Sequence, residues 1–179
     1  MTAHAAPGAC QTLMDLAARE EQSKWVAVND GVMGGRSSGG PVMGKDAMGF
    51  MGVINTNGGG FSSVRRGLAP GTLAGTQGLM VRVKTDGRAY RLTLRTAERF
   101  RGRSVSYTAD IDAGADGAWT DVYVPFDRFS ASVFGQPVPA APVDPATAWS
   151  LGFIIGDGVD GPFEMAVARI DACAASPAA

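Results

Sequence analysis

The sequence predicts an all-β fold, an antiparallel β-sandwich or barrel, and two observations support this prediction. Short runs of alternating apolar and polar residues follow one another from residue 25 onward. Glycine, proline, asparagine and aspartate separate these runs, which is the pattern of consecutive strands joined by turns. No second helix of convincing length interrupts them, so a fold that alternates strands and helices is not expected.

The alternation places eight strands along the chain. They are expected at 49–55, 61–66, 79–85, 89–96, 104–111, 118–126, 149–157 and 163–171. Asp86-Gly87, between the third and fourth strands, is a typical hairpin turn, so we expect these two strands to pair. Segment 127–148 contains four prolines and is expected to be an ordered surface loop. The core should contain Leu79, Val81, Val83, Tyr90, Leu92, Leu94, Val122, Val124, Phe153 and Ile155.

The N-terminal segment has a different pattern. One amphipathic helix is expected within residues 11–22, with Leu13, Leu16 and Ala17 on one face. We therefore divide the chain into a tail with a short helix at 1–22 and a sandwich domain at 23–173.

Composition limits the possible functions. The net charge of −1 gives no overall attraction to nucleic acid or to a membrane surface, although thirteen of the sixteen cations are arginine. The only histidine is His4, so a serine or cysteine nucleophile lacks its usual base. Two cysteines and one histidine are too few for a structural zinc site of the usual type. We expect no enzyme activity, no cofactor and no resident metal.

The two ends of the chain bear on its location. The first ten residues lack the apolar stretch of a signal peptide, and no run of about 18 apolar residues predicts a membrane span. A cytoplasmic protein is expected; the alternative is a periplasmic protein in which Met1 replaces a removed signal peptide, with Ala3-His4-Ala5 as the remnant of its cleavage site. Cys10 and Cys173 can form a disulfide in an oxidising compartment if the termini meet, and remain thiols in the cytoplasm.

A glycine-rich segment at 25–40 raises the question of phosphate binding. It lacks the Lys-Ser/Thr pair of a P-loop, and the residues after it are too rich in glycine and proline to form a helix. We instead expect a tight loop in which Asn29 or Asp30 accepts backbone hydrogen bonds. Asp30 and Arg36 flank the glycines and could approach within ion-pair distance.

A basic surface is predicted on the expected hairpin. Alternation points Arg82 and Lys84 outward from one strand and Arg91 and Arg95 outward from the next, side by side. Such crowding costs repulsion unless a partner or neighbouring acids compensate. The surface is therefore either a solvated face with interleaved acids or a recognition surface for an anionic or polar partner. Nucleic acid is not expected, because the aromatic residues alternate into the core and leave no stacking platform.

Five ordered motifs between residues 23 and 171 resemble the complex I intermediate-associated protein family. They are WVAVNDGVMGGRSSG, GGGFSSVR, GLMVRVKTDGRAYRLTLRT, VYVPF and LGFIIGDGVDGPFEMAVARI. The resemblance implies a galactose-binding-like jelly roll without catalytic activity. It also implies a chaperone-like role in assembly, since the eukaryotic members are assembly factors for NADH:ubiquinone oxidoreductase. The chain carries no mitochondrial targeting segment, so a bacterial member is expected.

Two functional hypotheses follow. The first is a protein that binds complex I subunits or assembly intermediates through the basic surface and its rim loops. The second is a carbohydrate or small-ligand binding module, for which Trp25, Trp119 and Trp149 are candidate stacking residues, although a core or rim position is the simpler interpretation of each. The residues assigned to binding in either case are Arg82, Lys84, Arg91, Arg95, Asn29, Asp30 and Arg36.

Overall fold

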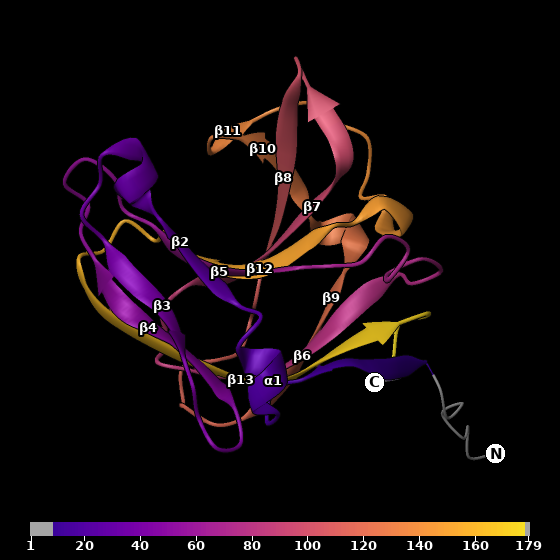
Figure 1. The fold of residues 1–179 in the computed structure, drawn as a ribbon, viewed down its shortest axis with the longest axis horizontal. Coiled ribbons are helices and arrows are strands. Elements are labelled where there is room, and N and C mark those ends of the chain that lie inside the picture. The colour runs from indigo at the N-terminus through magenta and orange to yellow at the C-terminus, as the bar shows by residue number, and fades with distance from the viewer. Residues whose placement is uncertain (1–8, 178–179) are drawn as a thin grey trace.

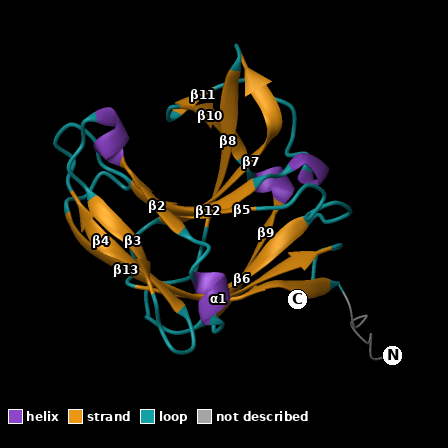
Figure 2. Ribbon diagram, viewed as in Figure 1, coloured by secondary structure: helices purple, strands orange, loops and turns teal. Residues whose placement is uncertain are grey.

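A computed structural model describes residues 9–177 as two packed antiparallel sheets that form a jelly-roll sandwich (Figure 1). The possible cleavage remnant at Ala3-His4-Ala5 lies outside the described residues. Helical structure is limited to short segments (Figure 2). These are α1 (Arg19–Gln22) and the 3-10 turns η1 (Asp30–Met33), η2 (Phe126–Arg128) and η3 (Pro145–Thr147).

The six-stranded sheet has the order β3-β4-β13-β6-β9, with β1 paired to β13 beside that path. Its strands are β1 (Cys10–Asp15), β3 (Ser38–Val42), β4 (Met48–Ile54), β6 (Gly78–Thr85), β9 (Thr120–Pro125) and β13 (Gly161–Cys173).

The seven-stranded sheet has the order β11-β10-β8-β7-β12-β5-β2. Its strands are β2 (Val26–Asn29), β5 (Ser62–Gly67), β7 (Tyr90–Phe100), β8 (Arg103–Asp110), β10 (Ser130–Val133), β11 (Gln136–Pro137) and β12 (Ser150–Ile155). In Figure 1 this sheet bends around β12, with β2 on the left and β8, β10 and β11 above. The six-stranded sheet lies on the opposite side of β12. The outer face of the seven-stranded sheet therefore lies on the inside of the bend.

The expected strands and core are confirmed. All eight predicted strands are present, and β7 and β13 extend beyond their expected C-terminal ends. Nine of the ten predicted core residues are fully buried, and Val122 is partly buried against the same cluster. Alternation identified the core because each strand buries one face against the opposite sheet.

The expected pairing of the strands around Asp86-Gly87 is wrong. β6 pairs with β13 and β9, whereas β7 pairs with β8 and β12 in the other sheet. The turn carries the chain from one sheet to the other, and Asp86 holds it there. Its carboxylate accepts hydrogen bonds from the Tyr90 hydroxyl and from the backbone N–H groups of Arg88 and Glu164.

The expected helix within residues 11–22 is also wrong over its first half. Residues 10–15 form β1, which pairs with β13, and only Arg19–Gln22 is helical. The long strand β13 offers free backbone groups along this stretch, and they outweigh the helical propensity of the segment. The loop expected at 127–148 contains the short hairpin β10–β11, while β2 and β3 had no predicted counterpart.

A disulfide joins Cys10 to Cys173, which confirms that the two cysteines can meet. It links β1 to β13 at positions that already face each other in the ladder. The bond closes a loop between residues 163 positions apart.

Reducing this disulfide should weaken the fold. Closing so long a loop restricts the unfolded chain, and loss of a native disulfide typically costs about 2–5 kcal/mol. We expect the free energy of unfolding in urea to fall by that amount when reductant is added or when both cysteines are replaced by serine. Reductant should have no effect on the double variant. Equal denaturation midpoints for oxidised and reduced protein would contradict this prediction.

Candidate functional site

The glycine-rich segment is organised around a buried carboxylate. Asp30 has no exposed surface and accepts three backbone hydrogen bonds, from Ser37 (2.9 Å), Gly60 (2.6 Å) and Phe61 (3.2 Å). Burial alone would raise the pKa of Asp30, but the hydrogen bonds from Ser37, Gly60 and Phe61 outweigh it, and the net pKa lies below the ordinary value. The expectation that Asp30 accepts backbone hydrogen bonds in this loop is confirmed.

The glycines are required because the backbone passes very close to this carboxylate. A Cβ atom on Gly35 would lie 2.3 Å from Asp30 Cγ, and one on Gly59 would lie 2.6 Å from Asp30 Oδ2. Gly34 has a φ of 85°, in the left-handed region that favours glycine. The segment is therefore a backbone cradle for one of the protein's own side chains.

Asn29 is held between the two sheets, whereas Arg36 is exposed to solvent. Asn29 bridges the two sheets, because its amide donates to the Gly39 carbonyl and its side-chain oxygen accepts from the Ser62 hydroxyl. Arg36 is exposed. Asp30 and Arg36 do not form the ion pair that the sequence left open, because backbone donors surround the buried carboxylate.

The four basic residues predicted to share one surface lie on two. Arg82 and Lys84 project from the six-stranded sheet and Arg91 and Arg95 from the other, because β6 and β7 belong to different sheets. Arg82 contacts Asp121 (3.1 Å) and lies over the Trp119 ring. Arg169, on the neighbouring strand, contacts the same Asp121 at 3.6 Å. On the six-stranded sheet, the predicted basic surface is therefore a solvated face with interleaved acids.

On the seven-stranded sheet, Arg65, Arg91 and Arg95 lie on the inside of the bend. Strand register places Arg65 opposite Gly152, and Gly152 opposite Thr93, across β5, β12 and β7. One row away, Arg95 stands opposite Ser150; on the other side of Gly152, Ile154 separates Ser63 from Arg91. We call this outer surface the arginine face. It is defined by Arg65, Arg91 and Arg95 and the β12 residues Ser150, Gly152 and Ile154 between them.

The floor of the arginine face is covered. Ser63, Thr93 and Ser150 lie on the outer side of the sheet yet have exposed fractions of only 0%, 6% and 7%. A Cβ on Gly152 would lie 3.1 Å from Arg65 Cγ and 3.1 Å from Thr93 Cγ2, so the stem of Arg65 packs directly above this glycine. Small residues on β12 thus leave room for long side chains to lie over the strand.

The arginines of this face form no ion pair within the described part of the chain. In the described range 9–177, no carboxylate lies within ion-pair distance of Arg65, Arg91 or Arg95, although Asp110 faces Arg91 in the ladder. Burial lowers the pKa of Arg65 and Arg95, and the like charge of Arg95 lowers the pKa of Arg65 further. Both remain cationic near neutral pH, because a guanidinium starts from a very high pKa.

Two polar groups near these arginines also lack partners. Arg65 Nε and Ser104 Oγ are buried and form no hydrogen bond with any described residue. Buried donors are normally paired, because an unmade hydrogen bond leaves the full desolvation cost.

The rim of the face carries an exposed aromatic residue. Phe134, at the tip of the β10–β11 hairpin, is 69% exposed and has a φ of 48°. Phe134 and Gly135 both have positive φ, as the two-residue turn of this hairpin requires. The Arg103 guanidinium lies 5.1 Å from the Phe134 ring centroid.

The three tryptophans do not form a stacking surface. Trp25 is buried against Phe153, and Trp119 lies with Arg82 on the other sheet. Trp149 precedes β12, and its indole N–H donates to the Thr96 carbonyl at 2.8 Å. Their interpretation as core or rim residues holds.

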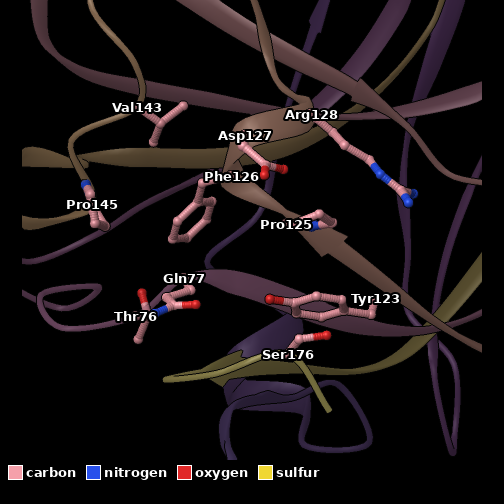
Figure 3. A pocket seen from close by; sticks show the side chains of 10 residues that line it. All are labelled: Thr76, Gln77, Tyr123, Pro125, Phe126, Asp127, Arg128, Val143, Pro145 and Ser176. Carbon is pink, nitrogen blue, oxygen red and sulfur yellow. The ribbon is translucent and has the colours of Figure 1, made fainter. Parts of the chain in front are cut away.

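A separate pocket lies beside η2 (Figure 3). Phe126 and Gln77 form part of its wall, and Arg128 extends away from Gln77 and Thr76. Asp127 is its single acidic side chain. Because its charged groups do not converge, this pocket is a weaker candidate than the arginine face.

Two further findings concern the described residues as a whole. Within 9–177, no three histidine, cysteine, aspartate or glutamate side chains are grouped so as to hold a metal ion. No helix in the same part of the chain has the length and apolar character needed to span a bilayer.

Arg65 is the site residue that sequence reasoning missed. Its signal was present in the predicted strand 61–66, where Val64 must face the core and Arg65 therefore outward. Its position beside Arg95 depends on β12, which comes from much later in the chain and inserts between β5 and β7.

The fold is a jelly-roll sandwich, and it is shared by solved structures of low sequence identity. Two similar structures are the family 11 carbohydrate-binding module from Clostridium thermocellum in complex with a β-1,3-1,4-mixed-linked tetrasaccharide and the family 11 module of the cellulosomal cellulase Lic26A-Cel5E of the same organism. The first is 18% identical, with a TM-score of 0.70 over 94% of this chain and 98% of that one. The second is 17% identical, with a TM-score of 0.71 over 93% and 95%. An agarase, AgWH50C, is 8% identical, with a TM-score of 0.60 over 96% of this chain and 25% of the agarase.

The amino-acid sequence identifies the family to which the chain belongs. Residues 14–167 match the family described as complex I intermediate-associated protein 30 (CIA30), and the chain belongs to it. No curated protein matches the chain. The resemblance noted from the five motifs is therefore confirmed.

Removing the Asp30 carboxylate should destabilise the protein. Asp30→Ala leaves three backbone donors unpaired, and we expect the free energy of unfolding to fall by about 1–3 kcal/mol. Asp112, which is exposed, provides the control: Asp112→Ala should change stability by less than about 0.5 kcal/mol. Equal stability of Asp30→Ala and wild type in urea titrations would contradict this role.

The same carboxylate should make stability depend on acid pH. Because the pKa of Asp30 is lower in the folded state than its ordinary value of 3.8, its contribution is fully present above that value. The contribution is lost as the pH falls through the lower folded pKa. Denaturant titrations between about pH 5 and pH 2 should show a smaller loss of stability in Asp30→Ala than in wild type. Parallel curves would refute the assignment.

Proposed function

We propose that this protein is a non-catalytic binding protein of the assembly-factor kind and that it engages a polypeptide partner through the arginine face. One observation carries the proposal: three arginines share this face, two of them substantially desolvated, and none of the three forms an ion pair with a described residue. Such an arrangement costs folding stability, whereas arginine is enriched at protein interfaces because its planar fork binds carboxylates and carbonyls.

Apolar side chains at the edge of the face favour a polypeptide partner. Val26, at the start of β2, stands opposite Arg65 in the ladder and is exposed, and Val32 and Met33 on η1, which follows the end of β2, are exposed as well. A surface that combines arginine with uncovered aliphatic groups matches the composition of protein interfaces. Complex I subunits or assembly intermediates are the proposed partners, in keeping with the family to which the chain belongs.

Carbohydrate is the second candidate ligand. The exposed Phe134 at the rim and the hydroxyl groups of Ser106 and Thr108 provide the kinds of groups that hold sugars. Against this, the outward positions of β5, β12, β7 and β8 at the centre of the face carry no aromatic residue. A sugar ring at the centre would therefore lack a stacking surface.

Photo-crosslinking can identify what contacts the face. A photoreactive phenylalanine analogue at Ser132, which lies on the extension of the face along β10, should crosslink to a polypeptide in cells of the native host. The same analogue at Lys84, on the opposite sheet, should not give that product. Mass spectrometry of the product names the partner. Equal crosslinking from both positions would contradict the proposed face.

Replacing the three arginines should weaken binding and leave the fold intact. In the variant Arg65→Gln, Arg91→Gln, Arg95→Gln we expect capture of the crosslinked partner to weaken by about tenfold or more, with little change in Tm. The matched control removes three charges elsewhere: Arg82→Gln, Lys84→Gln, Arg128→Gln. Equal loss in both variants would indicate a general charge effect. Retention of a mixed-linked β-glucan by wild type in affinity electrophoresis, lost in the first variant, would instead favour the carbohydrate.

A further inference from the structure

We propose that Arg65 and Arg95 together clamp a carboxylate of an acidic peptide segment that lies over β12. This inference rests on the proposed function, because it names the chemistry that the partner presents to the same face. The clamp has one arm on β5 and one on β7, with Gly152 and Ser150 between them.

The geometry suits an oxyanion between the two guanidinium groups. Arg65 and Arg95 stand on adjacent rows on either side of β12, so they face each other diagonally over Gly152 and Ser150. Because these β12 residues are small, the space above them is left to the arginine side chains and to whatever they hold. A guanidinium binds a carboxylate through two parallel N–H groups, and Arg65 and Arg95 are each only partly buried.

Electrostatics favours the same occupant. Arg65 and Arg95 stand on adjacent rows on either side of β12, and burial together with the like charge of Arg95 lowers the pKa of Arg65. A carboxylate between them replaces this repulsion with two attractions in a poorly solvated place, where charges interact more strongly than in water. Arg91 is not part of the clamp, because Asp110 faces it across the ladder and supplies negative charge on that side.

The neighbouring surface fits a peptide better than an acidic sugar. Ile154 lies on the row next to Gly152, and the exposed Val26 lies on the same row as Arg65. These aliphatic groups offer apolar contact to side chains that flank a glutamate or aspartate. An acidic sugar would instead need a stacking residue above β12, and the outward residues of β12 are serine, glycine and isoleucine.

Defined probes test the clamp on the whole protein. Isothermal titration calorimetry would compare capped hexaglutamate, capped hexaglutamine and trigalacturonate, at about 0.02 M and 0.3 M NaCl. We expect hexaglutamate to bind, to weaken by about tenfold or more at the higher salt, and to bind more tightly than trigalacturonate. Hexaglutamine should not bind measurably.

Single substitutions assign the binding to the two arginines. Arg65→Gln and Arg95→Gln should each weaken hexaglutamate binding by about tenfold, whereas Arg82→Gln on the other sheet should not change it. Neither clamp variant should lower the Tm, because each removes one of two repelling charges and retains most of the side-chain stem. A purely structural arginine would lower the Tm when replaced.

Each contrary result has a defined meaning. Hexaglutamate binding that is unchanged in both clamp variants, or absent in wild type, refutes the clamp, while crosslinking from Ser132 still tests the proposed function by itself. Tighter binding of trigalacturonate overturns the peptide as occupant in favour of an acidic sugar. If hexaglutamine binds as tightly as hexaglutamate, the face binds backbone or amide groups, and the proposal that it binds a carboxylate is refuted.

Discussion

The crossover between β6 and β7 determines which charges share a surface. Asp86 binds the Tyr90 hydroxyl and the Glu164 N–H, so the turn is fixed to β13 on one side and to the start of β7 on the other. Burial and the hydrogen bond to Asp86 raise the pKa of Tyr90, so it remains a neutral donor to that carboxylate. Because the chain changes sheet here, two strands adjacent in sequence direct their outward residues to opposite sides of the molecule.

A second interaction secures the same crossover. Arg88 donates to both oxygens of Asp157, at 2.9 and 2.6 Å, and to the carbonyls of Gly161 and Pro162. The hydrogen bonds from Arg88 lower the pKa of Asp157 despite its burial, so the pair stays ionised. The contacts of Arg88 stabilise the fold. The same is true of Arg66, which pairs with Glu21. Arg65 and Arg95 differ from both, because neither forms an ion pair with a described residue.

Sequence reasoning succeeded where local pattern determines structure. Alternation located the eight central strands and their inward residues because burial of one face repeats every second residue. It failed for β3, whose Gly39 and Pro41 disfavour a strand, and which exists because of its pairing with β4. Gly52 is required there by close backbone approach, since a Cβ atom would lie 2.0 Å from the Ser38 carbonyl oxygen.

The same limit applies to the site. The outward direction of Arg91 and Arg95 followed from alternation, but their neighbours did not, because neighbours depend on sheet order. The turn signal at Asp86-Gly87 suggested a local hairpin, and Arg82 and Lys84 were grouped with them for that reason alone. Arg65 lay outside the predicted group because a strand distant in sequence, β12, brings β5 beside β7.

The glycine-rich loop and the arginine face are connected through β5. The backbone donors Gly60 and Phe61, which bind Asp30, immediately precede β5, and β2, which leads into Asp30, pairs along β5 with Asn29 opposite Ser62. The buried carboxylate therefore fixes the start of β5 relative to its edge partner. Register matters here because a slip of one residue would turn Arg65 inward and bring Arg66 to the outer face. The most distinctive segment of the sequence thus holds β5 in its correct row, and with it Arg65, for which we propose a role in recognition.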